Sequence, residues 1–360
     1  MASFDLTKNW SIIVPANAAA VKKAGEDLNR CIKLLAGRLE ASVLTDTSAD
    51  PLQTPVIILN FDSGSPEGRG FSWKLGEDRL EITGQGEGGL CKGIYNFLST
   101  LGFKWPEPVS TLQKVSPKGT LDKEILPPWE ESNIYSIKTT QVRNLSVPEG
   151  TYKRLAIPQK SQSLQNQKKL SALMRWAIKN SFDALILPFN PIRSYKKKHG
   201  KNFLENAVKE AALYGLIVEA GGWIISSFVP RKLFFFHREL FRMEGGKRQK
   251  QIHFCPTSPE TIAKLRSESK KLFLAARGID TFHLWPEEGK EHTWCACPSC
   301  RAFSIADQYR IAVNAIGDSL AELSPGKSIS ILEHSNEEEL IPLRPNIFVI
   351  GPRDFTRFQY

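Results

Sequence analysis

The apolar positions in the N-terminal third of the chain follow two periods, which together predict short strands alternating with helices. Strand-like apolar runs occupy residues 10–15, 41–46, 55–62 and 71–84. Apolar positions at helical spacing occupy residues 18–37 and 89–102. The pattern predicts a compact α/β domain over residues 1–108.

Residues 106–129 have a different composition from the segments on either side. They are rich in proline, serine and lysine and show no sustained period. Such a stretch is typical of a linker or a wrapped connection. We therefore expect a linker over residues 109–130 and a second domain over residues 131–360.

The second domain alternates strand-like and helical runs throughout its length. Strands are expected at residues 134–144, 183–190, 215–223, 280–288, 328–335 and 346–354. Helices are expected between them, at residues 170–181, 202–215, 258–278 and 304–323. Capping signals mark two of the helix starts, at Ser258 with Pro259 and at Ser304 with Asp307. This repetition predicts a parallel sheet joined by crossover helices.

Six strands in this order indicate a (β/α) TIM-like barrel that is incomplete at its C-terminal end. The roughly 230 residues available are fewer than the ~250 that a complete eight-unit barrel uses. An open barrel leaves an apolar edge exposed, so we expect self-association as a homo-oligomer or pairing with a partner.

Composition and charge limit the functional classes. Hydrophobic residues make up 41% and charged residues 24%, as in ordinary globular proteins, and the formal net charge is +10. No run reaches the roughly 18 apolar residues of a membrane span, and the first residues lack a secretory pattern, so we expect a cytoplasmic protein without membrane contact. The basic clusters at 193–201 and 245–251 resemble no nucleic-acid module, so we expect a solvated basic surface, no nucleic-acid partner and room for anionic sugars.

Polar side chains follow the predicted strands at their carboxyl ends, where parallel α/β folds carry their chemistry. A pair of carboxylates flanking a bond is what glycosidic cleavage requires. We expect Glu288 to be the general acid, because it lies beside Gly289 at the start of a loop, with Glu287 orienting it or binding substrate. Glu333 is the expected second carboxylate, with Glu219 in reserve.

The same strand ends carry residues suited to binding a sugar, since aromatic faces form platforms for sugar rings. The substrate-binding candidates are Arg143, Asn190, Glu219, Trp223, Trp285 and Trp294. The alternative for the tryptophans is that they fill the mouth of the barrel as packing residues.

Cysteines are concentrated in one motif. Cys295, Cys297 and Cys300 form C-x-C-x-x-C, whose three thiolates can converge on one ion, and a closed tetrahedral zinc site needs a fourth ligand. Cys255 is the expected fourth ligand, because it precedes a helix start on the same predicted face. His292 and His253 are alternative ligands. Free reduced thiols are the alternative to a structural zinc ion.

Two stretches resemble known families. Residues 88–108, "GGLCKGIYNFLSTLGFKWPEP", resemble the end of the small α/β domain that precedes the catalytic barrel in α-glucuronidases and β-hexosaminidases. Residues 234–261 and 282–303 are similar to an uncharacterised family of glycoside-hydrolase-like barrels with a W-C-x-C-P-x-C motif.

The resemblance implies carbohydrate chemistry in a (β/α) barrel. By position it implies that Glu287 or Glu288 is the acid and that Arg143 is a sugar ligand. The chain departs from this family after the third strand, where Gly221 and Gly222 are followed by Trp223 rather than by histidine.

Three functional hypotheses follow. The first is a glycoside hydrolase acting on an oligosaccharide, with the positive charge favouring an acidic one. The second is a non-catalytic carbohydrate-binding or scaffold protein with a structural zinc site. The third, a zinc-dependent hydrolase, conflicts with four cysteine ligands, which would leave no open position for water.

Overall fold

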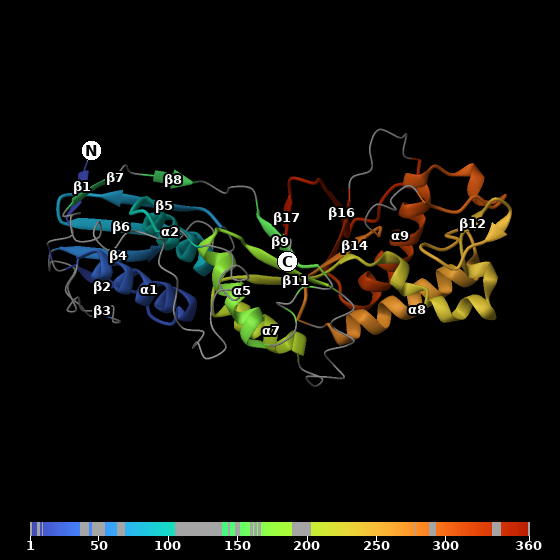
Figure 1. The fold of residues 1–360 in the computed structure, drawn as a ribbon, viewed down its shortest axis with the longest axis horizontal. Coiled ribbons are helices and arrows are strands. Elements are labelled where there is room, and N and C mark those ends of the chain that lie inside the picture. The colour runs from blue at the N-terminus through green and yellow to red at the C-terminus, as the bar shows by residue number, and fades with distance from the viewer. Residues whose placement is uncertain are drawn as a thin grey trace, which may run out of the picture.

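The computed structural model describes residues 2–5, 10–36, 43–44, 55–62, 69–103, 139–142, 145–147, 152–158, 167–188, 203–276, 278–287, 293–332 and 340–358, with a few isolated positions. The molecule is elongated. One sheet lies at the N-terminal end, and helices α8 (Pro259–Ala275) and α9 (Ile305–Leu323) lie at the other (Figure 1).

The N-terminal sheet has six strands in the order β3-β2-β4-β6-β5-β8. Its strands are β2 (Ser11–Ile13), β3 (Val43–Leu44), β4 (Val56–Phe61), β5 (Phe71–Leu75), β6 (Arg79–Gly84) and β8 (Leu145–Val147). Helices α1 (Ala19–Ala36) and α2 (Gly86–Thr100) pack against each other beside it. All of these elements except β8 lie where the apolar pattern predicts them.

A second, parallel sheet has seven strands in the order β16-β15-β14-β11-β10-β9-β17. Its strands are β9 (Arg154–Ala156), β10 (Ala184–Pro188), β11 (Ile217–Trp223), β14 (Thr281–Trp285), β15 (Ser328–Leu332), β16 (Ile347–Ile350) and β17 (Phe355–Arg357). Helices α5 (Gln167–Lys179), α7 (Phe203–Ala212), α8 and α9 are its crossovers. Short 3-10 turns η2 (Ile225–Phe228), η3 (Arg231–Phe235) and η4 (Arg238–Leu240), with the hairpin β12 (Met243–Glu244) and β13 (Lys247–Arg248), fill the β11–α8 connection.

The first predicted barrel strand, at residues 134–144, is wrong for the part that the structure describes, residues 139–142. Residues Thr139–Val142 form β7, which pairs antiparallel with β1 (Ala2–Asp5), and β8 pairs with β5 of the N-terminal sheet. The first strand of the second sheet is β9, and the expected count of six becomes seven in the described part of the chain. Strand β8 therefore belongs to the N-terminal sheet, although we predicted that its residues belong to the barrel domain.

The parallel sheet is curled into a half-barrel. Strand β16 lies at one edge and β17 beside β9 at the other, yet only residues 351–354 connect them. An extended chain rises about 3.3–3.6 Å per residue, so this connection spans at most ~18 Å. The curl brings Arg154 of β9 over the ring of Phe348 of β16, at 5.9 Å.

The two sheets and their helices share a continuous apolar core. Helix α2 packs on α5, and a buried ion pair joins Lys92 Nζ to Asp183 Oδ1 at 2.6 Å. The glycines at the start of α2 allow close packing, because a Cβ on Gly88 would lie 2.6 Å from the carbonyl oxygen of Gly215. None of the helices in the described part of the chain combines the length and apolar character of a membrane span.

Candidate functional site

The inside of the curled sheet is filled at its carboxyl end by apolar side chains. Ala156, Ile186, Trp285 and Ile350 form a buried cluster, against which Trp223, Leu332, Phe348 and Phe355 pack. The ring of Phe355 stacks on Trp285 at 4.5 Å, so the short strand β17 closes this layer from the side.

Beneath this layer lies a buried polar network centred on Glu219. Arg154 Nε donates to Glu219 Oε2 at 2.9 Å, and His283 Nε2 lies 2.9 Å from the same oxygen. Because a carboxylate only accepts, His283 donates through Nε2, and its Nδ1 accepts from the Ser330 hydroxyl at 2.5 Å. Trp285 Nε1 in turn donates to Ser330 Oγ at 3.3 Å. The network therefore links strands β9, β11, β14 and β15 inside the half-barrel.

Burial and partners determine the charges of this network. Burial lowers the pKa of His283 by more than Glu219 raises it, so the imidazole is neutral. Burial opposes ionisation of Glu219, but hydrogen bonding to His283 and the charge of Arg154 outweigh it and lower its pKa. Glu219 is therefore an ionised carboxylate with 2% of its surface exposed. It lies inside β11 rather than at the strand end where we predicted it.

The three candidate tryptophans do not share one open rim. Trp285 is fully buried, with Trp223 edge-on to it at 4.8 Å. Trp294 is 5% exposed and packs against Tyr309 and Phe254 in the main core. For Trp285 and Trp294 the structure favours the alternative that they are packing residues.

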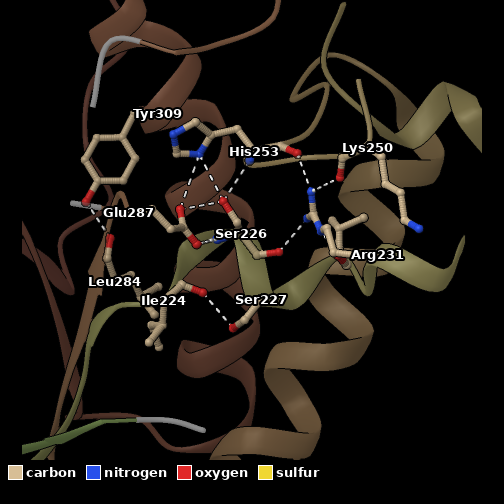
Figure 2. A network of polar contacts seen from close by, with 10 residues as sticks. Ile224, Ser226, Ser227, Arg231, Lys250, His253, Leu284, Glu287 and Tyr309 are labelled. Carbon is tan, nitrogen blue, oxygen red and sulfur yellow. Dashed lines mark hydrogen bonds and ion pairs between the residues drawn. The ribbon is translucent and has the colours of Figure 1, made fainter. Parts of the chain in front are cut away.

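Glu287, two residues after β14, presents its carboxyl group at the carboxyl end of the sheet. The backbone N–H of Ser226 donates to Oε1 at 3.0 Å, and the Ser226 hydroxyl donates to Oε2 at 2.5 Å (Figure 2). His253 Nδ1 lies 3.6 Å from Oε2. Burial raises the pKa of Glu287 despite the hydrogen bonds from Ser226, while 28% of the side chain remains exposed. A carboxyl group whose pKa is raised stays protonated to higher pH than an ordinary glutamic acid, as a general acid requires.

Arg231 fixes the segments that surround Glu287. Its guanidinium donates to the carbonyl oxygens of Ser226 at 2.6 Å, His253 at 3.0 Å and Lys250 at 3.2 Å (Figure 2). Burial lowers the pKa of Arg231 to about 10, which leaves it charged at neutral pH. One cation therefore ties η2 to the loop that carries His253.

The loop at His253 is strained. Ile252 and His253 have φ of 47° and 51°, in the left-handed region that non-glycine residues avoid. Each such residue costs about 1–3 kcal/mol and persists only where its surroundings enforce it. The imidazole stacks on Trp294 at 4.6 Å, and the backbone N–H of His253 donates to Ser226 Oγ at 2.8 Å.

The four cysteines predicted as metal ligands converge. Cys255, Cys295, Cys297 and Cys300 are all buried, and their ligand atoms lie within 4.8 Å of one another. The alternative ligand His253 points instead at Ser226 and Glu287. The other alternative, His292, lies outside the described residues, as do the candidates Glu288, Glu333, Arg143 and Asn190.

Sequence reasoning missed several residues around these groups. Ser226 lies in a 3-10 turn rather than at a strand end, and Arg154 and His283 lie within strands. The serines Ser226 and Ser227, which follow the glycines of β11, were the sequence signal that could have predicted a hydrogen-bond donor to a carboxylate.

A cavity of about 700 Å³ lies elsewhere, along α7 on the outside of the parallel sheet. Lys23, Gln167 and Tyr214 are among its lining residues, and Lys23 Nζ lies 4.2 Å from the centre of the Tyr214 ring. Glu287 does not contribute to it.

No protein-family profile and no curated protein sequence matches the chain. Solved structures of glycoside hydrolases do match it. The chitobiase of Flavobacterium johnsoniae has a TM-score of 0.56 at 14% identity, over 98% of this chain and 53% of that one. A β-N-acetylhexosaminidase from Bacteroides fragilis has 0.54 at 12%, over 96% and 66%. A GH138 enzyme targeting pectin rhamnogalacturonan II has 0.54 at 13%, over 95% and 38%.

At such identities the likeness shows the fold. The chain shares its overall fold with these glycoside hydrolases, and its curled parallel sheet is a TIM-like half-barrel. It spans between 38% and 66% of the length of these three proteins.

Proposed function

We propose that the protein is a glycoside-hydrolase-like protein that acts on an oligosaccharide through the carboxyl group of Glu287. The proposal rests on the exposure, the pKa and the position of this carboxyl group. It is partly exposed, its pKa is raised, and it follows strand β14 in a fold shared with glycoside hydrolases. The net charge of +10 favours an acidic oligosaccharide.

The common mechanism of glycosidic cleavage uses a second carboxylate. Glu288 and Glu333 are the candidates, and the distance from Glu287 decides the mechanism: about 5–5.5 Å fits retention and about 6.5–9.5 Å fits inversion. Glu219 is not a suitable partner, because its carboxylate is engaged by Arg154 and His283.

A specific observation favours a second candidate function, non-catalytic carbohydrate binding. Trp285, Phe355 and Ile350 fill the mouth of the half-barrel, where a substrate of a barrel glycosidase would enter. A protein with this filling could hold a sugar at its surface without cleaving it.

One experiment separates the two functions. The full chain is tested for turnover on a panel of neutral and acidic aryl glycosides and, in parallel, for binding to an array of oligosaccharides. Turnover that falls about a hundredfold or more in Glu287→Gln supports the hydrolase. Binding without turnover supports the second candidate. Turnover that is equal in wild type and Glu287→Gln would refute the role of Glu287, and Glu288→Gln then tests the neighbouring carboxylate.

A further inference from the structure

We infer that Cys255, Cys295, Cys297 and Cys300 bind one zinc ion as a closed tetrathiolate, and that this ion positions the loop facing Glu287. The inference rests on the geometry and surroundings of the four sulfur atoms. It does not require that the protein cleaves or binds a sugar.

The spacing of the sulfur atoms fits a tetrahedral ion. With Zn–S bonds of ~2.3 Å, the edge of a regular S₄ tetrahedron is ~3.8 Å. Cys255 Sγ lies 3.7 Å from both Cys297 Sγ and Cys300 Sγ. These separations are far longer than the ~2.05 Å of a disulfide bond.

Hydrogen-bond donors surround the sulfur atoms as thiolates require. The backbone N–H of Met243 donates to Cys295 Sγ at 3.2 Å, and Thr257 Oγ1 lies 3.1 Å from Cys300 Sγ. A tetrathiolate around Zn²⁺ retains two negative charges. The guanidinium of Arg248, with Nη1 3.9 Å from Cys295 Sγ, offsets part of this charge.

The ligand set determines what the ion can do. Four thiolates complete the coordination of Zn²⁺ and leave no position for water or substrate, so the site is structural rather than catalytic. All-sulfur tetrahedral ligation also suits iron, which makes the identity of the metal part of the test.

The ion would join two segments that are distant in sequence. Cys255 follows the strained residues Ile252 and His253, and Cys295 follows Trp294, which stacks on His253. His253 in turn contacts Ser226, the hydrogen-bond donor to Glu287. Binding of both segments to one ion would hold His253 in its left-handed conformation, which makes the cysteines positioning residues.

The test is the metal content of the full chain, purified under reducing conditions from cells supplied with zinc and iron. We expect about one zinc and no iron per chain. Cys297→Ser should lose most of the zinc and melt at a lower temperature. Cys91→Ser, which changes a buried cysteine outside the cluster, should keep its zinc. Glu287→Gln should also keep it, so failure of the proposed function and failure of this inference are distinguishable.

A second measurement covers the case in which Cys297→Ser does not fold. Wild-type protein reconstituted with Co²⁺ should show the intense visible bands of a tetrahedral cobalt thiolate. Chelation of the metal should increase amide exchange in the peptide that carries Ile252 and His253. Wild-type protein that contains no zinc, that contains iron instead, or that gives an octahedral cobalt spectrum would overturn the inference.

Discussion

Replacement of Glu219 by glutamine removes the negative charge that neutralises Arg154 inside the half-barrel. The two side chains are 3% and 13% exposed, so water cannot take over that role. Breaking a buried pair by removing one partner costs about 3–5 kcal/mol, because the remaining charge stays buried. An unfolding entropy of about 2.1 cal/mol/K per residue gives ~0.76 kcal/mol/K for 360 residues. Glu219→Gln should therefore lower Tm by about 4–7 °C.

The assay is thermal unfolding of both proteins at several pH values. The folded-state pKa of Glu219 is lowered below its ordinary value of 4.5, so its contribution is complete above that pH and is lost as pH falls through the folded value. The difference between wild type and variant should be full at pH 7 and shrink in acid. Glu205→Gln, which breaks the exposed pair with Lys209, serves as the control and should change Tm little. A drop in Glu219→Gln no larger than in this control would refute the buried-charge account.

Three further predictions follow from other contacts. Gly221→Ala should lower the free energy of unfolding by more than about 4 kcal/mol in urea titration. Gly221 has φ of 129°, and a Cβ there would lie 2.0 Å from the carbonyl oxygen of His283. A loss below ~1 kcal/mol would contradict so close an approach of the two strands. Ser226→Ala should raise the pKa of Glu287 further, because a hydrogen bond that favours the carboxylate is removed, and carboxyl NMR should detect the shift. Light scattering should report a dimer or larger assembly, since β16 and β17 are sheet edges, and a stable monomer would contradict this.

The apolar pattern was sufficient to predict most of the parallel sheet. Strands β10, β11, β14, β15 and β16 lie within predicted runs, because long buried runs leave few alternatives. Strands β9 and β17 have three residues each, too few to establish a period. The true partners of Thr139–Val142 and Leu145–Val147 depend on long-range pairing with β1 and β5, which local pattern does not encode.

Some residues of the candidate site could likewise be predicted from the sequence, and others could not. The C-x-C-x-x-C spacing and the helix start at Ser258 were enough to predict that Cys255 joins the other three cysteines. Glu287 was predicted at the end of the fourth strand as the residue that orients Glu288 or binds substrate, and Glu288, the predicted general acid, lies outside the described residues. Ser226, the partner of Glu287, was not predicted, because the chain turns back in η2 only after Gly221 and Gly222 allow β11 to approach β14. Glu219 was misplaced because it was counted as a strand-end residue, although the predicted strand and β11 both continue to Trp223 and place it inside the strand.

The pH dependence of kcat/KM on a hydrolysed glycoside tests the role of Glu287 most directly. A general acid must be protonated in the free enzyme, so activity should fall as pH rises through the pKa of Glu287, which burial raises above 4.5. Wild type should show this alkaline limb, and the residual activity of Glu287→Gln should lack it. An alkaline limb that is unchanged in Glu287→Gln, or rates that are equal in the two proteins, would contradict the account.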